Sequence, residues 1–169
     1  MESTLSFYTT VKAGLDQVEG LLRRVPEDSD PLIRPILSHI LGVSGKRIRP
    51  AVTLLASRLD EGSDQSAILM ASGVELLHIA TLIHDDMVDN ASIRRGQATI
   101  GTVWDPHTAV LIGDYIFATS ATFVCDTMSI RVVRRFSETI MELSSGELME
   151  RFSTFNWRQS RKEYEDRIY

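Results

Sequence analysis

The sequence predicts an all-α protein folded as an antiparallel helix bundle. Apolar residues recur at spacings of three and four along most of the 169 residues, which is the period of a helix and not of a strand. Only 10 Gly and 5 Pro occur, and few of them interrupt the long apolar segments. The 43% of hydrophobic residues and 24% of charged residues are typical of a globular chain. We therefore expect a single helical domain over residues 1–169.

Start and stop signals divide the chain into successive helices. Pro26 ends the first helix, and Asp30 followed by Pro31 is a cap signal for the second. Ser160 and Glu163 have the spacing of a capping box that starts a last helix. Loops are expected at 61–64 and in the charged stretch that contains Gly96 and Gly101. The other helices predicted by the apolar period cover about 4–24, 31–41, 50–59, 65–89, 106–127 and 130–152.

Charge and cysteine content exclude several classes of protein. The 18 basic and 23 acidic residues give a net charge of -5, which argues against a nucleic-acid binder because phosphate neutralisation needs a basic surface. No run of 18 uninterrupted apolar residues predicts a membrane span, and the N-terminus has no secretory signal pattern. Cys125 is the one cysteine, which favours a reducing, cytoplasmic setting, and we expect it to be a small buried residue.

An acidic stripe ends the long apolar helix predicted at 65–89. At 100° per residue, Asp85 and Asp89 lie about 40° apart, and His78 falls between them on the same face. Asp86 lies beside this stripe. Three carboxylates at the C-terminal end of an apolar helix repel one another and face the wrong pole of the helix dipole. Either water solvates this end of the helix, or divalent cations of the Mg²⁺ type provide the opposite charge.

Two basic elements accompany the acidic stripe. Arg94 and Arg95 follow it directly, and guanidinium groups match phosphate oxygens in pairs. Lys46 and Arg49 lie at a loop-to-helix junction, where free backbone N–H groups also favour an anion. Either element alone is commonly only a solvated surface. Together with a metal-type acidic stripe, they indicate a substrate that carries diphosphate groups.

These motifs resemble those of the trans-type polyprenyl diphosphate synthases. Residues 85–89 with 94–96 resemble the first aspartate-rich motif of that family. Residues 45–50 look like its Gly-Gly-Lys-Arg-x-Arg-Pro motif, with Ser44 in place of the first Gly. The runs 75–86 and 113–115 are also similar to the family, and the motifs follow in the family's order between about 42 and 116. The resemblance implies a helix bundle of the isoprenoid synthase type.

The resemblance implies a reaction and a role for each residue. The family joins isopentenyl diphosphate to an allylic prenyl diphosphate, and Mg²⁺ helps the allylic diphosphate to leave. His84 has no such role and is expected to be structural. The implied metal ligands are Asp85, Asp86 and Asp89; Arg94 would bind the allylic diphosphate; and Lys46, Arg49, His78 and Arg95 would bind isopentenyl diphosphate.

The same helix is expected to line the cavity for the growing product. Val74, Leu77 and Thr81 share a face with Asp85 and lead away from the metal site. In the family, a bulky aromatic residue four or five positions before the first aspartate shortens the product. Those positions are Thr81 and Ala80 here, so we expect a medium-to-long product of four or more isoprene units. The role of Ala80 comes from the resemblance alone.

The family's second aspartate-rich motif does not occur in these 169 residues. We therefore expect a truncated bundle that corresponds to the N-terminal half of such an enzyme, with little or no prenyl transfer by this polypeptide alone. An alternative is a catalytically incomplete partner or regulatory subunit of a split prenyltransferase. Family members are homodimers, and the apolar stretch 109–124 is the expected interface, or else an ordinary core helix.

Two other enzyme classes compete with this interpretation. His84-Asp85 is an HD doublet of the kind found in metal phosphohydrolases, which need further histidine ligands such as His39, His78 or His107. That class leaves the basic motifs without a purpose. A terpene cyclase also uses an aspartate-rich helix, but it has no use for the element at Lys46 and Arg49.

Overall fold

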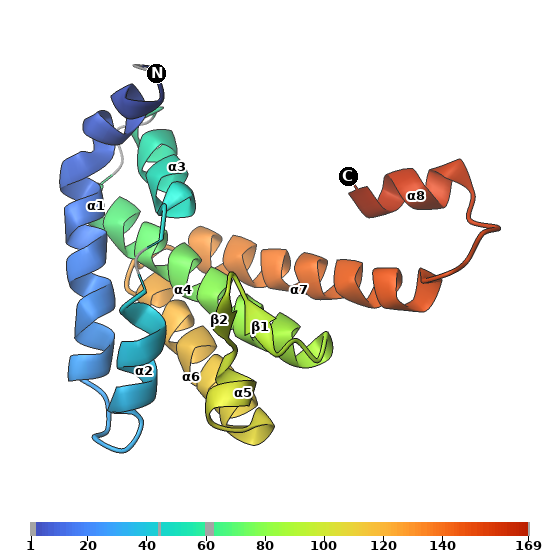
Figure 1. Ribbon diagram of the computed structural model, residues 1–169. Coiled ribbons are helices and arrows are strands. Elements are labelled where there is room, and N and C mark those ends of the chain that lie inside the picture. The colour runs from blue at the N-terminus through green and yellow to red at the C-terminus, as the bar shows by residue number, and fades with distance from the viewer. Residues whose placement is uncertain (1–2, 44, 60–62, 169) are drawn as a thin grey trace. The chain divides into compact units, whose positions relative to one another are not determined.

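The computed structural model describes residues 3–43, 45–59 and 63–168, and for 3–7 and 166–168 it describes the backbone only. Ser44 of the basic motif and residues 61 and 62 of the loop expected at 61–64 therefore lie outside the described residues. The described chain is mostly helical (Figure 1). The all-α prediction is confirmed.

The chain divides into two compact units, Met1–Met128 and Ser129–Tyr169. The prediction of a single domain over 1–169 stays a prediction. The helices of the first unit are α1 (Ser3–Glu27), α2 (Arg34–Leu41), α3 (Ile48–Ala56), α4 (Asp64–Val88), α5 (Ile100–Val103) and α6 (Pro106–Cys125), with a 3₁₀ turn at Ser57–Leu59 and a hairpin of β1 (Ile93–Arg94) and β2 (Gln97–Ala98). The second unit holds α7 (Ile130–Ser153) and α8 (Arg161–Ile168).

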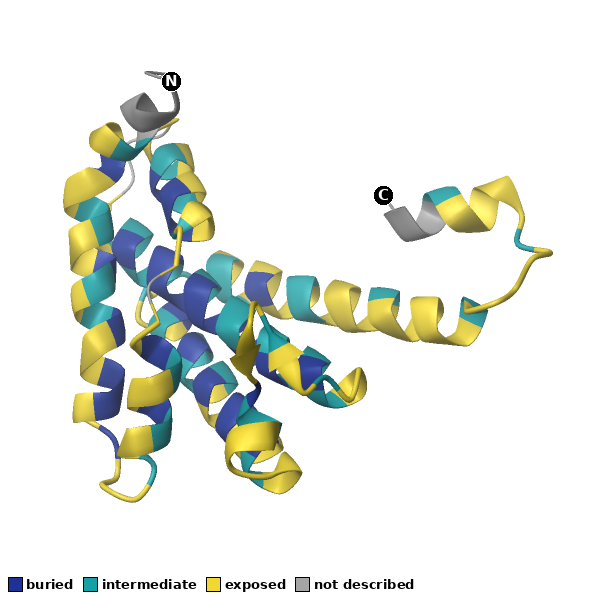
Figure 2. Ribbon diagram, in the orientation of Figure 1, coloured by how far each residue is buried: buried dark blue, intermediate teal, exposed yellow. Residues whose placement is uncertain are grey.

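Helix α4 is the centre of the first unit, where it contacts α1, α3 and α6. Its inner faces are buried along most of their length (Figure 2). The contact with α6 is close because both helices carry glycine there. A β-carbon at Gly73 would lie 3.0 Å from Val124, and one at Gly113 would collide with the imidazole of His84. The core shared by α4 and α6 includes Leu76, Ala80, Ile83, Ala109, Ile112 and Ile116.

Helices α4 and α6 are also long and apolar enough to cross a membrane, by length and composition alone. Half of the most apolar window of α4 is buried inside the protein. A core helix of a globular protein has the same composition, since apolar residues on all sides suit a helix that packs against several neighbours. The packing of α4 against three other helices accounts for its character.

Local signals place several helix ends where the sequence predicts them. Asp105 begins α6, because its carboxylate accepts hydrogen bonds from the backbone N–H groups of His107 (2.9 Å) and Thr108 (3.0 Å). The capping box before α8 is formed: Ser160 N–H donates to Glu163 Oε2 at 2.7 Å, and Glu163 N–H donates to Ser160 Oγ at 3.2 Å. Hydrogen bonds from Ser160 lower the pKa of Glu163.

Other boundaries differ from the prediction. Helix α1 continues through Pro26 to Glu27, because Arg34 donates to the carbonyls of Pro26 and Glu27 (both 3.1 Å) and so satisfies the helix end. Asp30 accepts from Leu32 N–H at 2.8 Å and shapes a turn, so α2 begins at Arg34 and not at 31.

The charged stretch after α4 and the single cysteine also differ from what the sequence predicts. The stretch forms a hairpin and α5 where we expect a loop. Cys125 is exposed and not buried, because it ends α6 while the neighbouring Val124 takes the core position.

Candidate functional site

The polar side chains of α4 that the sequence singles out lie on one face of the helix, together with Glu75. Glu75, His78, Asp85, Asp86 and Asp89 fall within an arc of about 100° on the helix. Along this face Glu75 and Asp86 are buried, His78 and Asp85 are half-buried, and Asp89 is exposed at the end of the helix. The sequence predicts a role for each of these residues except Glu75.

The β1–β2 hairpin brings Arg94 to the acidic end of this face. Arg95 and Gly96 form its two-residue turn, both with positive φ angles of 51° and 81°, as tight hairpin turns require. Arg94 Nε then donates to Asp86 Oδ1 at 2.6 Å. The side chain of Asp86 is 10% exposed and that of Arg94 is 35% exposed. In this structure Asp86 is therefore engaged by an arginine.

Asp85 lies in a field of opposing charges. Burial raises the pKa of its carboxyl group above the ordinary value, and the neighbouring carboxylates of Asp89 and Asp86 raise it further. Arg94 opposes this shift. A bound cation would relieve the same repulsion and favour the charged carboxylate.

The residues at this end suit a metal that is shared with a substrate. Among the described residues, no three side chains of His, Cys, Asp or Glu lie close enough together to hold a metal ion by themselves. Asp85 and Asp89 nevertheless lie one turn apart on one face, and Mg²⁺ commonly takes only one or two carboxylates together with substrate phosphates. The two residues fit such a site, and the metal roles of Asp85, Asp86 and Asp89 stay predictions.

Basic groups gather around His78. Burial lowers the pKa of its imidazole, and Arg49, Arg95 and Arg94 lower it further, whereas Glu75 raises it. The three arginines come from α3 and from the hairpin, so the fold places the two basic elements of the sequence within electrostatic reach of one histidine. Lys46 is exposed in the loop before α3, and its backbone carbonyl accepts a hydrogen bond from Tyr8 Oη at 2.8 Å.

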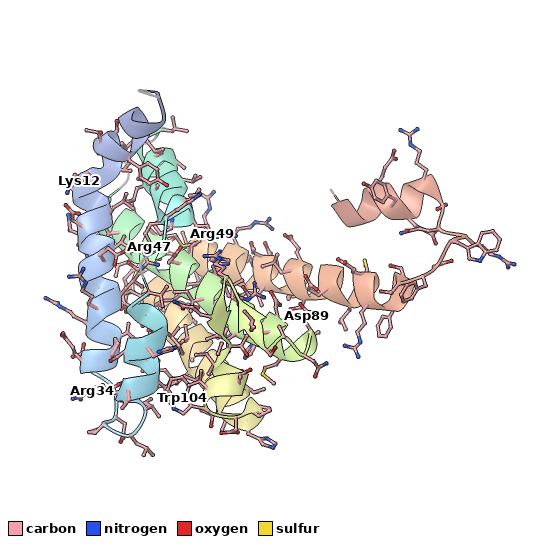
Figure 3. All side chains as sticks on the ribbon, in the orientation of Figure 1. Lys12, Arg34, Arg47, Arg49, Asp89 and Trp104 are labelled. Carbon is pink, nitrogen blue, oxygen red and sulfur yellow. The ribbon has the colours of Figure 1, made fainter. Side chains whose placement is uncertain are left out.

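Arg47 also lies near these basic groups, and the sequence predicts no role for it. Its Nε donates to Glu19 Oε1 at 2.5 Å and its Nη1 donates to Glu75 Oε1 at 2.9 Å. The side chain is only 10% exposed, and that of Glu75 is 8% exposed. Figure 3 shows Arg47 and Arg49 together beside α4, with Asp89 farther along. A single carboxylate in the middle of the most apolar helix was the signal that could have revealed this ion pair.

The residues predicted to line a product cavity have different surroundings. Val74 and Thr81 are half-buried, and Leu77 is buried. Ala80 is fully buried in the core. Thr81 turns its hydroxyl to the carbonyl of His78 at 2.9 Å. The cavity role of these four residues stays a prediction.

His84 has the structural role that the sequence predicts. Its Nε2 lies 3.3 Å from the carbonyl oxygen of Val110 and 3.4 Å from Asp114 Oδ1, both on α6. The imidazole fills the space that Gly113 leaves open. His84 therefore faces α6, whereas Asp85 lies on the polar face of α4. Among the described residues no cluster of three His, Cys, Asp or Glu side chains could hold a metal ion, so the structure adds nothing in favour of the phosphohydrolase alternative.

Solved structures share this helical arrangement. A heptaprenyl diphosphate synthase from Staphylococcus aureus superposes with a TM-score of 0.84 at 33% identity, over 94% of this chain and 50% of that one. A polyprenyl synthase from Caulobacter crescentus, complexed with calcium and isoprenyl diphosphate, gives 0.85 at 29% identity, over 96% and 49%. The fold and the polar face of α4 thus define a protein with the isoprenoid synthase fold.

The family follows from the sequence comparisons. Residues 30–169 match the model of the Polyprenyl synthetase family, and the chain belongs to this family. A nonaprenyl diphosphate synthase from Mycobacterium tuberculosis is 34% identical over 145 residues, which are 85% of this chain and 43% of that protein. The chain spans about half the length of the curated relatives that it matches, consistent with the predicted N-terminal half.

Proposed function

We propose that this chain supplies the first half of a trans-prenyltransferase site that joins an allylic diphosphate to isopentenyl diphosphate. The observation that carries the proposal is the single polar face of α4, where Asp85 and Asp89 lie at one end and His78 lies among Arg49, Arg94 and Arg95. Such a face combines a cation site with an anion site. Medium-to-long products are supported by relatives that make heptaprenyl and nonaprenyl chains.

Each residue has a part in this reaction. Asp85, Asp86 and Asp89 would hold Mg²⁺, which neutralises the charge of the leaving diphosphate. Arg94 can donate to the allylic diphosphate with the guanidinium nitrogens that Asp86 leaves free. The isopentenyl diphosphate would lie against Lys46, Arg49, His78 and Arg95, of which His78 is half-buried.

The remaining expectations belong to the same proposal. We propose that the protein is cytoplasmic, that it acts as a homodimer, and that its product cavity is bordered by Val74, Leu77, Thr81 and Ala80. In an active full-length form, Ala80→Phe should shorten the product. An unchanged distribution of product lengths, measured by chromatography of the dephosphorylated products, would contradict this part of the proposal.

A second candidate is a subunit that completes a separate catalytic partner. It is supported by relatives that are named as component 2 of a heptaprenyl diphosphate synthase. The chain alone should then show little or no prenyl transfer, and activity should appear on mixing with the partner. Robust turnover by the purified 169-residue chain would exclude both this candidate and the expected inactivity.

Binding of isopentenyl diphosphate tests the proposed function without turnover. The unaltered chain should bind this ligand in calorimetric titrations without metal. Lys46→Gln should raise the Kd by about tenfold, since a charge-assisted contact to a phosphate is lost. Lys12→Gln is the matched control, because Lys12 is exposed on α1 and pairs with Asp16 at 2.8 Å. Equal Kd values for both variants would contradict the assignment of Lys46.

A further inference from the structure

Arg47 occupies an unusual position between two exposed basic residues. Its backbone is left-handed, with φ 48° and ψ 37°, a conformation that costs a residue other than glycine about 1 kcal/mol or more. Lys46 and Arg49 on either side are exposed, whereas the side chain of Arg47 is 10% exposed. The turn at Arg47 therefore sends its side chain inward while its neighbours stay at the surface.

The inward side chain ties three elements together. The backbone carbonyl of Arg47 accepts from Ala51 N–H at 3.0 Å and starts α3. Its guanidinium group binds Glu19 of α1 and Glu75 of α4, at 2.5 and 2.9 Å. Burial lowers the pKa of Arg47, but the hydrogen bonds and the negative charges of Glu19 and Glu75 together raise it above the ordinary value.

Glu75 makes this pairing important for the anion site. It lies one turn before His78 on the polar face of α4, and its charge reaches that imidazole, whose pKa it raises. A buried carboxylate at this position would repel a diphosphate if no cation lay against it. Arg47 provides that cation from a buried position, so the exposed surface of the site remains open to the ligand.

We propose that Arg47 is a positioning residue of the isopentenyl diphosphate site. It fixes the loop that carries Lys46 and the first turn of α3 that carries Arg49, and it neutralises Glu75 so that the site keeps a positive field. This inference rests on the proposed function and adds a residue that does not itself contact the substrate.

The test compares four variants of the whole chain. Arg47→Met leaves Glu75 and Glu19 without their cation, and Arg47→Met with Glu75→Gln also removes the buried charge. Arg47→Lys keeps the charge but cannot bridge both carboxylates. Arg34→Met is the matched control, since Arg34 also ties helix ends together, through the carbonyls of Pro26, Glu27 and Ser29. Each variant is titrated with isopentenyl diphosphate without metal, well below its melting temperature.

A positioning role predicts a specific pattern of affinities. Arg47→Met should raise the Kd by at least about tenfold, and adding Glu75→Gln should recover part of that loss, because the repulsion is removed. Arg34→Met should lower Tm and leave the Kd unchanged. If Arg47 were merely structural, Arg47→Met would lower Tm and leave the Kd unchanged, and adding Glu75→Gln would not change the Kd either.

Three results overturn the inference. The first is a Kd of Arg47→Met equal to that of the unaltered chain, and the second is a loss of affinity that Glu75→Gln does not reduce. If Arg47→Met does not fold, Arg47→Lys decides, and an unchanged Kd in a folded Arg47→Lys protein is the third. An unaltered chain that does not bind isopentenyl diphosphate contradicts the proposed function as well, which separates that failure from failure of the inference alone.

Discussion

The loop before α3 and the hairpin after α4 both neutralise a buried carboxylate of α4, but they do so with different consequences. Each supplies an arginine that binds a buried carboxylate of α4, Arg47 to Glu75 and Arg94 to Asp86. The two carboxylates are three turns apart and lie within about 20° of each other on the helix. Both ends of one polar face are thus neutralised from outside the helix.

The two arginines differ in how much of the guanidinium group remains available to a ligand. Arg47 binds two carboxylates and is 10% exposed, so it has no free face for a ligand. The hydrogen bond that holds Arg94 uses Nε, and the side chain is 35% exposed, so its terminal nitrogens can reach a phosphate. We therefore propose different roles for them: Arg94 contacts substrate, and Arg47 positions the residues that do.

The largest expected effect is on stability. Arg47→Met should lower the free energy of unfolding by about 3–5 kcal/mol, because it leaves a buried carboxylate without a partner. Arg94→Met should cost about 1–3 kcal/mol, because water can reach Asp86 through the exposed hairpin. Urea denaturation followed by circular dichroism measures both. Equal losses in the free energy of unfolding would contradict the proposed difference between the two arginines.

Removal of metal should affect only the hairpin end. Binding of an allylic diphosphate should weaken by at least about tenfold when EDTA removes Mg²⁺, since carboxylates and phosphates then repel each other directly. Binding of isopentenyl diphosphate near Lys46 should change little. Asp85→Asn should reproduce the effect of EDTA, with Asp114→Asn on α6 as a control. Equal metal dependence of the two ligands in calorimetric titrations would contradict this division of the polar face.

The helices and the charged residues of the site follow from the sequence, and the ion pairs do not. Apolar periodicity locates α4 and α6 because burial of one continuous surface decides their structure. The partners of Arg47 lie 28 residues away in each direction, and no local pattern joins them. The hairpin has two-residue strands, too short for a periodic signal. Cys125 was predicted as buried from its residue type, whereas its place at the end of α6 leaves it exposed.

The hairpin turn offers a smaller perturbation of the Arg94 end. Gly96 has φ 81° with open space around it, so Gly96→Ala should cost about 1 kcal/mol through backbone strain alone. Looser placement of Arg94 should then weaken binding of magnesium pyrophosphate, and binding of isopentenyl diphosphate should weaken less. Gly20→Ala in α1 is the matched control, because nothing lies within 4 Å of its added carbon, and it should stabilise the helix. A stabilising Gly96→Ala would contradict the role of the turn.

The pKa of His78 reports on both ends of the face and should show the smallest effects. Burial and the arginines lower it below 6.5, the ordinary value. The unfolded chain therefore takes up a proton first, so the contribution of His78 to stability is complete above that value and is lost as the pH falls toward the pKa of the folded state. Glu75→Gln should lower the pKa further, and Arg94→Met should raise it, because these two charges act on the imidazole with opposite sign. NMR titration of the His78 ring protons measures both shifts. Shifts of the same sign would mean that the two ends of α4 do not act on one shared site.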